Sequence, residues 1–357
     1  MYPQNEPRVL QGMSSVMENF GMALRINYGY DLLGGMTVQM HLLQVTSVKR
    51  CPRRWQKIAR VLLAILCVLV LGVLIAVPPV VMGPMVDKHV DFTKVYAAED
   101  YGLSAEKLTL KTDDGLNISA FRVHRDNPRA VVIFISGIHG PSVTAFFGHA
   151  KMLADRGYAS VLFDTRAHGE SDGNRIGLGY EEWQDTKAVV DYIQSIDEYA
   201  DVPTVVFGVS MGGAIAINSI AQIPQIDGLI SMSAYSSWPD VFCDNMVTMG
   251  APAAFAWVEK PFVSAYVMLK YGIGARNMTP TNQISNLGDR PALFIHSDED
   301  SQVPFASFER LMRKAPEHVE SWVRDGDLHM ICKDYDNPLH DAEYAERILS
   351  FLAKHFD

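Results

Sequence analysis

An uncharged, almost purely aliphatic run from Val61 to Val86 limits the architectures open to this chain. At a rise of 1.5 Å per residue, a helix over this run is long enough to cross a hydrocarbon core of about 30 Å. A buried helix of a soluble protein keeps a polar stripe, which this run lacks. We therefore predict a transmembrane helix over residues 58–83. Pro78 and Pro79 fall near its outer end, where a helix can stop without leaving backbone groups unpaired in lipid.

The charges on either side of this run predict its orientation. The preceding segment carries basic residues without any acid: Lys49, Arg50, Arg53, Arg54, Lys57 and Arg60. The following segment carries more acids than bases: Asp87, Asp91, Glu99 and Asp100 against Lys88 and Lys94. The positive-inside rule then places residues 1–57 in the cytoplasm and the chain after the span outside it. A cleaved signal peptide is the alternative, but the apolar run is longer than a typical h-region and has no small-x-small cleavage site behind it.

Composition excludes several function classes. The 357 residues carry a formal net charge of -10, which argues against a nucleic-acid partner. The four cysteines share no spacing typical of a zinc site, so we expect neither a metal nor a cofactor. If the domain is extracytoplasmic, a Cys243–Cys332 disulfide and glycosylation at Asn117 or Asn277 are hypotheses to test. The sequence does not fix the oligomeric state.

After a linker over residues 84–104, the chain alternates short β-branched runs with amphipathic stretches. This rhythm is typical of an α/β fold in which crossover helices join the strands of a mostly parallel sheet. We predict an opening hairpin, central strands, and helices between them, all within one domain from residue 105 to 357. The predicted strands cover residues 107–111, 117–123, 130–136, 160–164, 204–208, 228–232, 292–296 and 321–323.

The sequence Gly208-Val209-Ser210-Met211-Gly212-Gly213 follows the strand that ends at residue 208 and precedes a helix of small residues. This is a G-x-S-x-G motif at a strand-to-helix turn. Residues without side chains flank the serine, so that its hydroxyl can project above the sheet from a strained turn. Ser210 is therefore the candidate nucleophile, and the Met211 N–H at the helix N-terminus is a candidate oxyanion donor.

Three further motifs occur in a fixed order around this turn: FISGIHG at residues 134–140, FDTRAHGESDG at 163–173 and ALFIHSDEDSQVP at 292–304. With these motifs, the chain from about residue 105 to its C-terminus resembles the α/β-hydrolase superfamily, and within it the serine-aminopeptidase and monoacylglycerol-lipase-like group. The resemblance implies a helical lid, which we place at about residues 234–289. It also implies a Ser-Asp-His triad and hydrolysis through an acyl-enzyme.

The resemblance implies which acid and which histidine complete the triad. Three acids compete in the loop after residue 297, and the family pattern G-x-x-D-x-x-V-P aligns its acid with Asp300, leaving Asp298 as the alternative. His329 follows the last predicted strand, so the order Ser, Asp, His matches the order typical of this fold. His318 precedes that strand and His340 opens the terminal helix, which favours surface positions for both.

In the family, a second oxyanion N–H comes from the residue after a His-Gly pair at the end of the third strand. Ser136-Gly137 occupies that place here, which makes Ile138 the donor. His139-Gly140 follows closely, and a shift of register would put Pro141 there, but proline has no N–H to donate. His139 is then a pocket-lining residue or a loop cap, and we favour the loop cap.

The loop over residues 163–173 contains a second set of polar side chains, Asp164, Arg166, His168 and Ser171. We interpret them as braces of the sheet edge beside the site. The lid is rich in aromatic residues and poor in acids, which favours an apolar acyl substrate over a peptide ammonium group. The lid aromatics are Trp238, Phe242, Phe255, Trp257, Phe262 and Tyr266, and most of them are expected to form the core of the lid itself.

The sequence thus predicts a membrane-anchored serine hydrolase that cleaves a carboxylic ester or similar acyl bond, with a small-molecule or lipid-like substrate. A peptidase or amidase of the serine-aminopeptidase type is the alternative. A hydrolase-fold binding protein without activity is a third interpretation, but such proteins usually lack a triad residue, and all three are present here.

Overall fold

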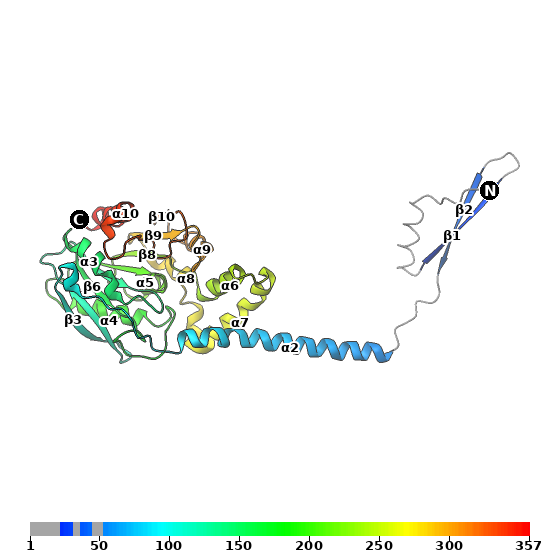
Figure 1. The fold of residues 1–357 in the computed structure, drawn as a ribbon, viewed down its shortest axis with the longest axis horizontal. Helices are drawn as coiled ribbons and strands as arrows, with labels where there is room; N and C mark the ends of the chain where they lie inside the picture. The colour runs from blue at the N-terminus through cyan, green and yellow to red at the C-terminus, as the bar shows by residue number, and fades with distance from the viewer. Residues whose placement is uncertain (1–21, 31–35, 45–52) are drawn as a thin grey trace. The chain divides into compact units, whose positions relative to one another are not determined.

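The computed structural model describes residues 22–30, 36–44 and 53–357, and it divides into two compact units, residues 1–72 and 73–357 (Figure 1). In the first unit, strands β1 (Met22–Tyr30) and β2 (Met36–Gln44) pair antiparallel, with Met22 opposite Gln44. This hairpin was not predicted from the sequence. The rest of the predicted cytoplasmic segment before Arg53 lies outside the described residues.

Helix α2 (Arg53–Val86) covers the aliphatic run. Among the described residues it is the helix long and apolar enough to span a membrane, with a mean hydropathy of 3.2 over its best window. The helix extends past the predicted span of residues 58–83 at both ends, and it runs through Pro78, Pro79 and Pro84. Packing supplies the reason at the C-terminal end: within the second unit, one face of α2 is buried at every fourth residue, at Leu74, Pro78, Met82 and Val86.

The second unit is built on an eight-stranded sheet with the order β10-β9-β8-β7-β5-β6-β4-β3. The neighbours from β6 to β10 pair in parallel, whereas β3 and β4 form an antiparallel hairpin at one edge. The predicted strands are confirmed. Their bounds are β3 (Ala105–Lys111), β4 (Asn117–Val123), β5 (Val131–Ile135), β6 (Ala159–Phe163), β7 (Thr204–Val209), β8 (Gly228–Met232), β9 (Ala292–Ser297) and β10 (Glu320–Arg324).

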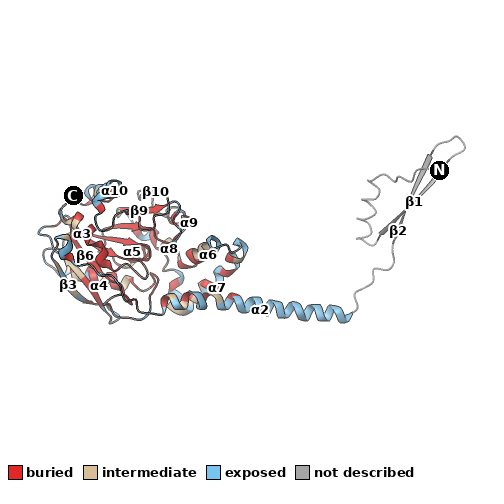
Figure 2. Cartoon of the chain, viewed as in Figure 1, coloured by how far each residue is buried: buried red, intermediate tan, exposed pale blue. Residues whose placement is uncertain are grey.

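Helices cover both faces of this sheet, as crossover connections between parallel strands require (Figure 1). The central strands are buried throughout (Figure 2). Their successive side chains enter two separate cores. In β5, for example, Ile133 belongs to one core and Phe134 to the other. The helices are α3 (Phe147–Ala154), α4 (Trp183–Gln194), α5 (Met211–Gln222), α9 (Ala306–Met312) and α10 (Ala342–Phe356).

The predicted lid region lies between β8 and β9. It contains α6 (Trp238–Thr248), α7 (Ala253–Tyr271) and the short α8 (Pro280–Gln283), and α6 packs against α7. The lid insertion therefore follows β8, and β8 is the neighbour of β7, the strand that leads to Ser210.

Candidate active site

Ser210 occupies the turn between β7 and α5 in a backbone conformation that is strained for a residue with a side chain. Its φ is 57° and its ψ is -120°. The turn is tight because a Cβ on Gly212 would collide with the carbonyl oxygens of Ile135 and Ser136 at the end of β5. The Ser210 N–H donates to the Met232 carbonyl at 2.8 Å. These contacts hold the serine at the carboxyl edge of the central strands.

His329 and Asp300 meet beside this edge. His329 Nδ1 lies 2.7 Å from Asp300 Oδ2, and both residues are buried. Asp300 follows β9 and accepts the backbone N–H groups of Gln302 and Val303 at 2.9 Å each. The His329 carbonyl accepts a hydrogen bond from the Ser233 hydroxyl at 2.6 Å, which fixes the loop that carries the histidine.

The two candidate acids have different partners. The exposed Asp298 accepts the backbone N–H of Gly326 at 2.8 Å and makes a turn contact, whereas Asp300 is the carboxylate bonded to His329. Burial opposes ionisation of Asp300, but the hydrogen bond and charge of His329 and the Val303 and Gln302 amides hold the pKa of Asp300 below its ordinary value. Asp300 is therefore ionised at neutral pH and can stabilise a protonated imidazole.

The loop after β5 approaches Ser210 closely. A Cβ built on Gly137 would lie 3.3 Å from Ser210 Cβ and 3.7 Å from Ser210 Oγ, so this loop passes directly over the nucleophile. Ile138 lines the same pocket as Ser210. Pro141, the residue of the alternative register, uses its carbonyl to accept the Ser136 hydroxyl.

His139 caps a different element from the one expected. Its φ of 63° turns the side chain so that Nε2 lies 2.7 Å from the Met85 carbonyl in the last turn of α2. The imidazole nitrogen donates to this carbonyl, because a backbone oxygen can only accept. His139 thus ties the loop that carries Ile138 to the end of the long apolar helix.

A pocket of about 570 Å³ opens beside Ser210 and His329, within the size range typical of small-molecule sites. Its walls are mostly apolar and come from three parts of the second unit: the end of α2, the lid, and the loops after β5 and β9. Three of the lid aromatics, Trp238, Phe242 and Phe255, line the pocket. Trp257, by contrast, is 78% exposed, so it does not belong to a lid core. None of the described carboxylates lines the pocket.

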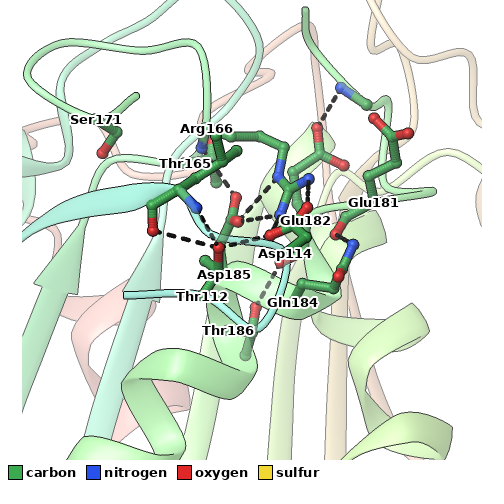
Figure 3. A network of polar contacts seen from close by, with 12 residues as sticks. Thr112, Asp114, Thr165, Arg166, Ser171, Glu181, Glu182, Gln184, Asp185 and Thr186 are labelled. Atoms are coloured by element: carbon green, nitrogen blue, oxygen red, sulfur yellow. Dashed lines mark hydrogen bonds and ion pairs between the residues drawn. The ribbon is translucent and has the colours of Figure 1, made fainter. Parts of the chain in front are cut away.

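The second polar set makes contacts within the molecule instead of facing the pocket. Asp164 accepts the Val143 N–H at 2.8 Å, and burial raises the pKa of Asp164 to about 7. Arg166 is bound by two carboxylates (Figure 3). It donates to Asp185 at 2.7 and 2.9 Å and to Asp114 at 2.8 Å. His168 Nδ1 lies 2.9 Å from the Arg166 carbonyl. These contacts brace the loop after β6.

The remaining candidate groups lie away from this pocket. His318 contacts the Arg290 carbonyl, and His340 pairs with Asp334 on the surface. Cys243 and Cys332 are separate buried thiols, so the hypothesis of a disulfide between them was wrong. Among the described residues, one group could hold a metal ion, but its members are exposed and do not line the pocket: His124, Asp126 and Glu198.

Sequence reasoning missed several residues at this site. His296 is buried with Nε2 3.8 Å from Asp300 Oδ2 and 2.8 Å from the Val303 carbonyl, and burial lowers its pKa. It packs behind the His329–Asp300 pair. Three residues of α2, Val77, Val81 and Met85, were also missed. A uniformly aliphatic run gives no periodic signal that would distinguish its pocket face from its other faces.

Comparisons with known proteins agree with this architecture. The family described as serine aminopeptidase, S33, matches residues 126–286. The chain is 26% identical over 206 residues to the uncharacterized protein YqkD of Bacillus subtilis. The matched region covers 56% of this chain and 65% of YqkD. It is also 26% identical over 203 residues to 2,6-dihydropseudooxynicotine hydrolase of Paenarthrobacter nicotinovorans, covering 56% of this chain and 52% of that enzyme.

Among solved structures, the Pyrococcus furiosus esterase Pf2001 superimposes with a TM-score of 0.57 at 23% identity, covering 76% of this chain and 98% of the esterase. The chain therefore has the α/β-hydrolase fold. The matching family and the hydrolase and esterase relatives support a serine hydrolase.

Proposed function

We propose that this protein is a membrane-anchored esterase that hydrolyses carboxylic esters with an apolar acyl group. The observation that carries the proposal is the apolar pocket of about 570 Å³ beside Ser210, which none of the described carboxylates lines. An apolar cavity favours an acyl chain, whereas binding a peptide ammonium group needs a convergent carboxylate.

In the proposed mechanism, His329 takes the proton of the Ser210 hydroxyl as Oγ attacks the ester carbonyl carbon. Asp300 holds the imidazole tautomer and stabilises the imidazolium. The N–H groups of Ile138 and Met211 bind the oxyanion, and loss of one such donor typically costs about 2.7–4 kcal/mol of barrier. The imidazolium protonates the leaving alcohol. Water then attacks the acyl-enzyme by the same route, which releases the acid and regenerates Ser210.

A peptidase or amidase is the second candidate, and the match to the serine aminopeptidase family favours it. The acids of the lid give it little support. Asp240 pairs with Lys260, and Asp244 binds Arg310 at 2.6 and 2.8 Å, so both carboxylates are already neutralised. Glu259, which also belongs to the lid, is buried on α7, and none of these three carboxylates lines the pocket.

Turnover of matched substrates distinguishes these candidates. We expect the purified full chain to hydrolyse p-nitrophenyl acyl esters with a kcat/KM well above that for aminoacyl p-nitroanilides, and Ser210→Ala to abolish both. Faster cleavage of the aminoacyl anilides would favour the peptidase. A folded wild type that cleaves neither substrate would favour the binding-protein interpretation.

The membrane anchor is part of the proposal. The apolar helix α2 supports a span, and the basic residues that precede it support a cytoplasmic N-terminus with the catalytic domain outside the cytoplasm.

A further inference from the structure

The last turns of α2 are an integral part of the catalytic unit. Met82 and Val86 are fully buried against it. Three polar contacts fasten this end: His139 Nε2 to the Met85 carbonyl at 2.7 Å, the Ile176 N–H to the Val86 carbonyl at 2.8 Å, and Lys270 to Asp87 at 2.5 Å. The apolar helix therefore does more than tether the enzyme, because its end is packed into the domain as a structural element.

The same helix end forms one wall of the pocket that holds Ser210. Val77, Val81 and Met85, spaced by four residues, lie on one stripe of α2 and line this pocket. Val81 remains 46% exposed, so the wall continues onto the surface of the helix. Another part of the wall comes from the lid, where Met246 and Met249 line the pocket and Met249 is 88% exposed.

The pocket wall begins where a membrane span would end. A helix needs about 20 apolar residues to cross the hydrocarbon core. Counted from Val61, the first residue after the basic flank, such a span reaches the region of Val80. Val77 and Val81 then lie at the outer boundary of the lipid. The lid also exposes large apolar side chains: Trp257 at 78%, Leu269 at 86% and Ile273 at 83%.

We propose that α2 is a component of the acyl-binding site, and that the substrate is a membrane-resident amphiphile whose long acyl chain enters the pocket along Val77, Val81 and Met85. The inference rests on the esterase function proposed above and adds the source and class of the substrate. An acyl chain that moves along α2 stays in contact with apolar surface from the bilayer to Ser210, so its methylene groups are not exposed to water.

The first test uses the full chain in phospholipid nanodiscs and a fluorophosphonate probe with a long alkyl tail that ends in a diazirine. The probe attaches to Ser210, and ultraviolet light then links its tail to the nearest segment, which peptide mass spectrometry identifies. We expect crosslinks on the peptide that contains Val77–Met85. Probe tails that are linked only to other segments would overturn the role of α2 but not the proposed esterase function. A Ser210 that the probe does not modify would overturn both proposals.

The second test compares Val81→Trp with Val80→Trp. Val80 neighbours Val81, is 69% exposed and does not line the pocket, so it is the matched control. We expect Val81→Trp to lower the ratio of kcat/KM for dodecanoyl over acetyl p-nitrophenyl esters by about tenfold or more, since small changes of fit in an apolar pocket have effects of this size. The control should keep the wild-type ratio.

Should Val81→Trp fail to fold, Val81→Ala gives a second measurement. It widens the wall, and we expect it to shift the preferred acyl chain toward bulkier groups. A chain-length profile that is unchanged in every folded Val81 variant would overturn the inference.

Discussion

Asp298 and Asp300 lie two residues apart after β9, yet their surroundings differ completely. The Asp298 side chain is exposed and accepts one hydrogen bond from a backbone N–H. Asp300 is buried and accepts hydrogen bonds from His329 and from two backbone N–H groups. A buried carboxylate with three hydrogen bonds is held in one orientation, which is what an acid that orients a histidine requires. The two residues therefore form a matched pair for mutation.

We expect Asp300→Asn to lower kcat by about 10⁴-fold, the size of loss seen when the orienting acid of a triad becomes an amide. The amide cannot stabilise the imidazolium and favours the wrong tautomer of His329. Asp298→Asn should keep kcat close to that of the wild type. Steady-state hydrolysis of a short-chain ester by both variants provides the measurement, and the reverse ranking would assign the role to Asp298.

Much of this site could be predicted from the sequence because its residues sit at fixed places on the sheet. The G-x-S-x-G turn locates Ser210, and the positions of the later strands suggest where an acid and a histidine should follow. Choosing Asp300 over Asp298 needed the family pattern, because both residues follow the same strand. The contact of His139 with α2 could not be predicted, since it joins two segments with no shared pattern.

At the scale of single elements, α7 contains an unusual buried acid. Glu259 is fully buried on the face of α7 that also buries Ala256 and Val263, and neither carboxylate oxygen has a hydrogen-bond partner among the described residues. Burial raises the pKa of Glu259 above its ordinary value, because the charged form loses its hydration. This acid therefore destabilises the lid when it is ionised.

We expect Glu259→Gln to raise the midpoint of thermal unfolding, more at pH 8 than at pH 5. The folded state holds the Glu259 proton more tightly than the unfolded state, so the wild type loses stability as pH rises above the unfolded pKa, and the glutamine variant does not. Thermal unfolding at both pH values measures this. Glu346→Gln, at an exposed position of α10, is the control and should change neither midpoint.

A gain that is equal at both pH values, or a loss at pH 8, would contradict this account of Glu259. A loss would indicate that the carboxylate has a partner and is useful to the lid in its charged form.

The course of α2 shows what sequence patterns miss at this scale. The run of apolar residues predicts the helix, and its prolines suggest an early end. The helix instead continues to Val86 because Met82 and Val86 find a fully buried environment on the catalytic unit. Local propensity was outweighed by tertiary packing, which a single sequence does not display.

For the whole molecule, we propose a membrane span with the catalytic domain outside the cytoplasm. We expect fusion of alkaline phosphatase to the C-terminus of the full chain to give an active reporter in a bacterial host, and fusion of green fluorescent protein to stay dark. The basic residues before α2 favour retention of the N-terminus in the cytoplasm. A fluorescent fusion with inactive phosphatase would reverse the proposed orientation, and release of the chain by alkaline carbonate would argue against a span.

Covalent labelling with a fluorophosphonate probe shows whether Ser210 is an activated nucleophile. We expect the probe to label the wild type and Ser301→Ala, which alters an exposed serine near the site, and to leave Ser210→Ala and His329→Ala unlabelled. Labelling that persists in Ser210→Ala, or folded wild type that does not react, would contradict this role of Ser210.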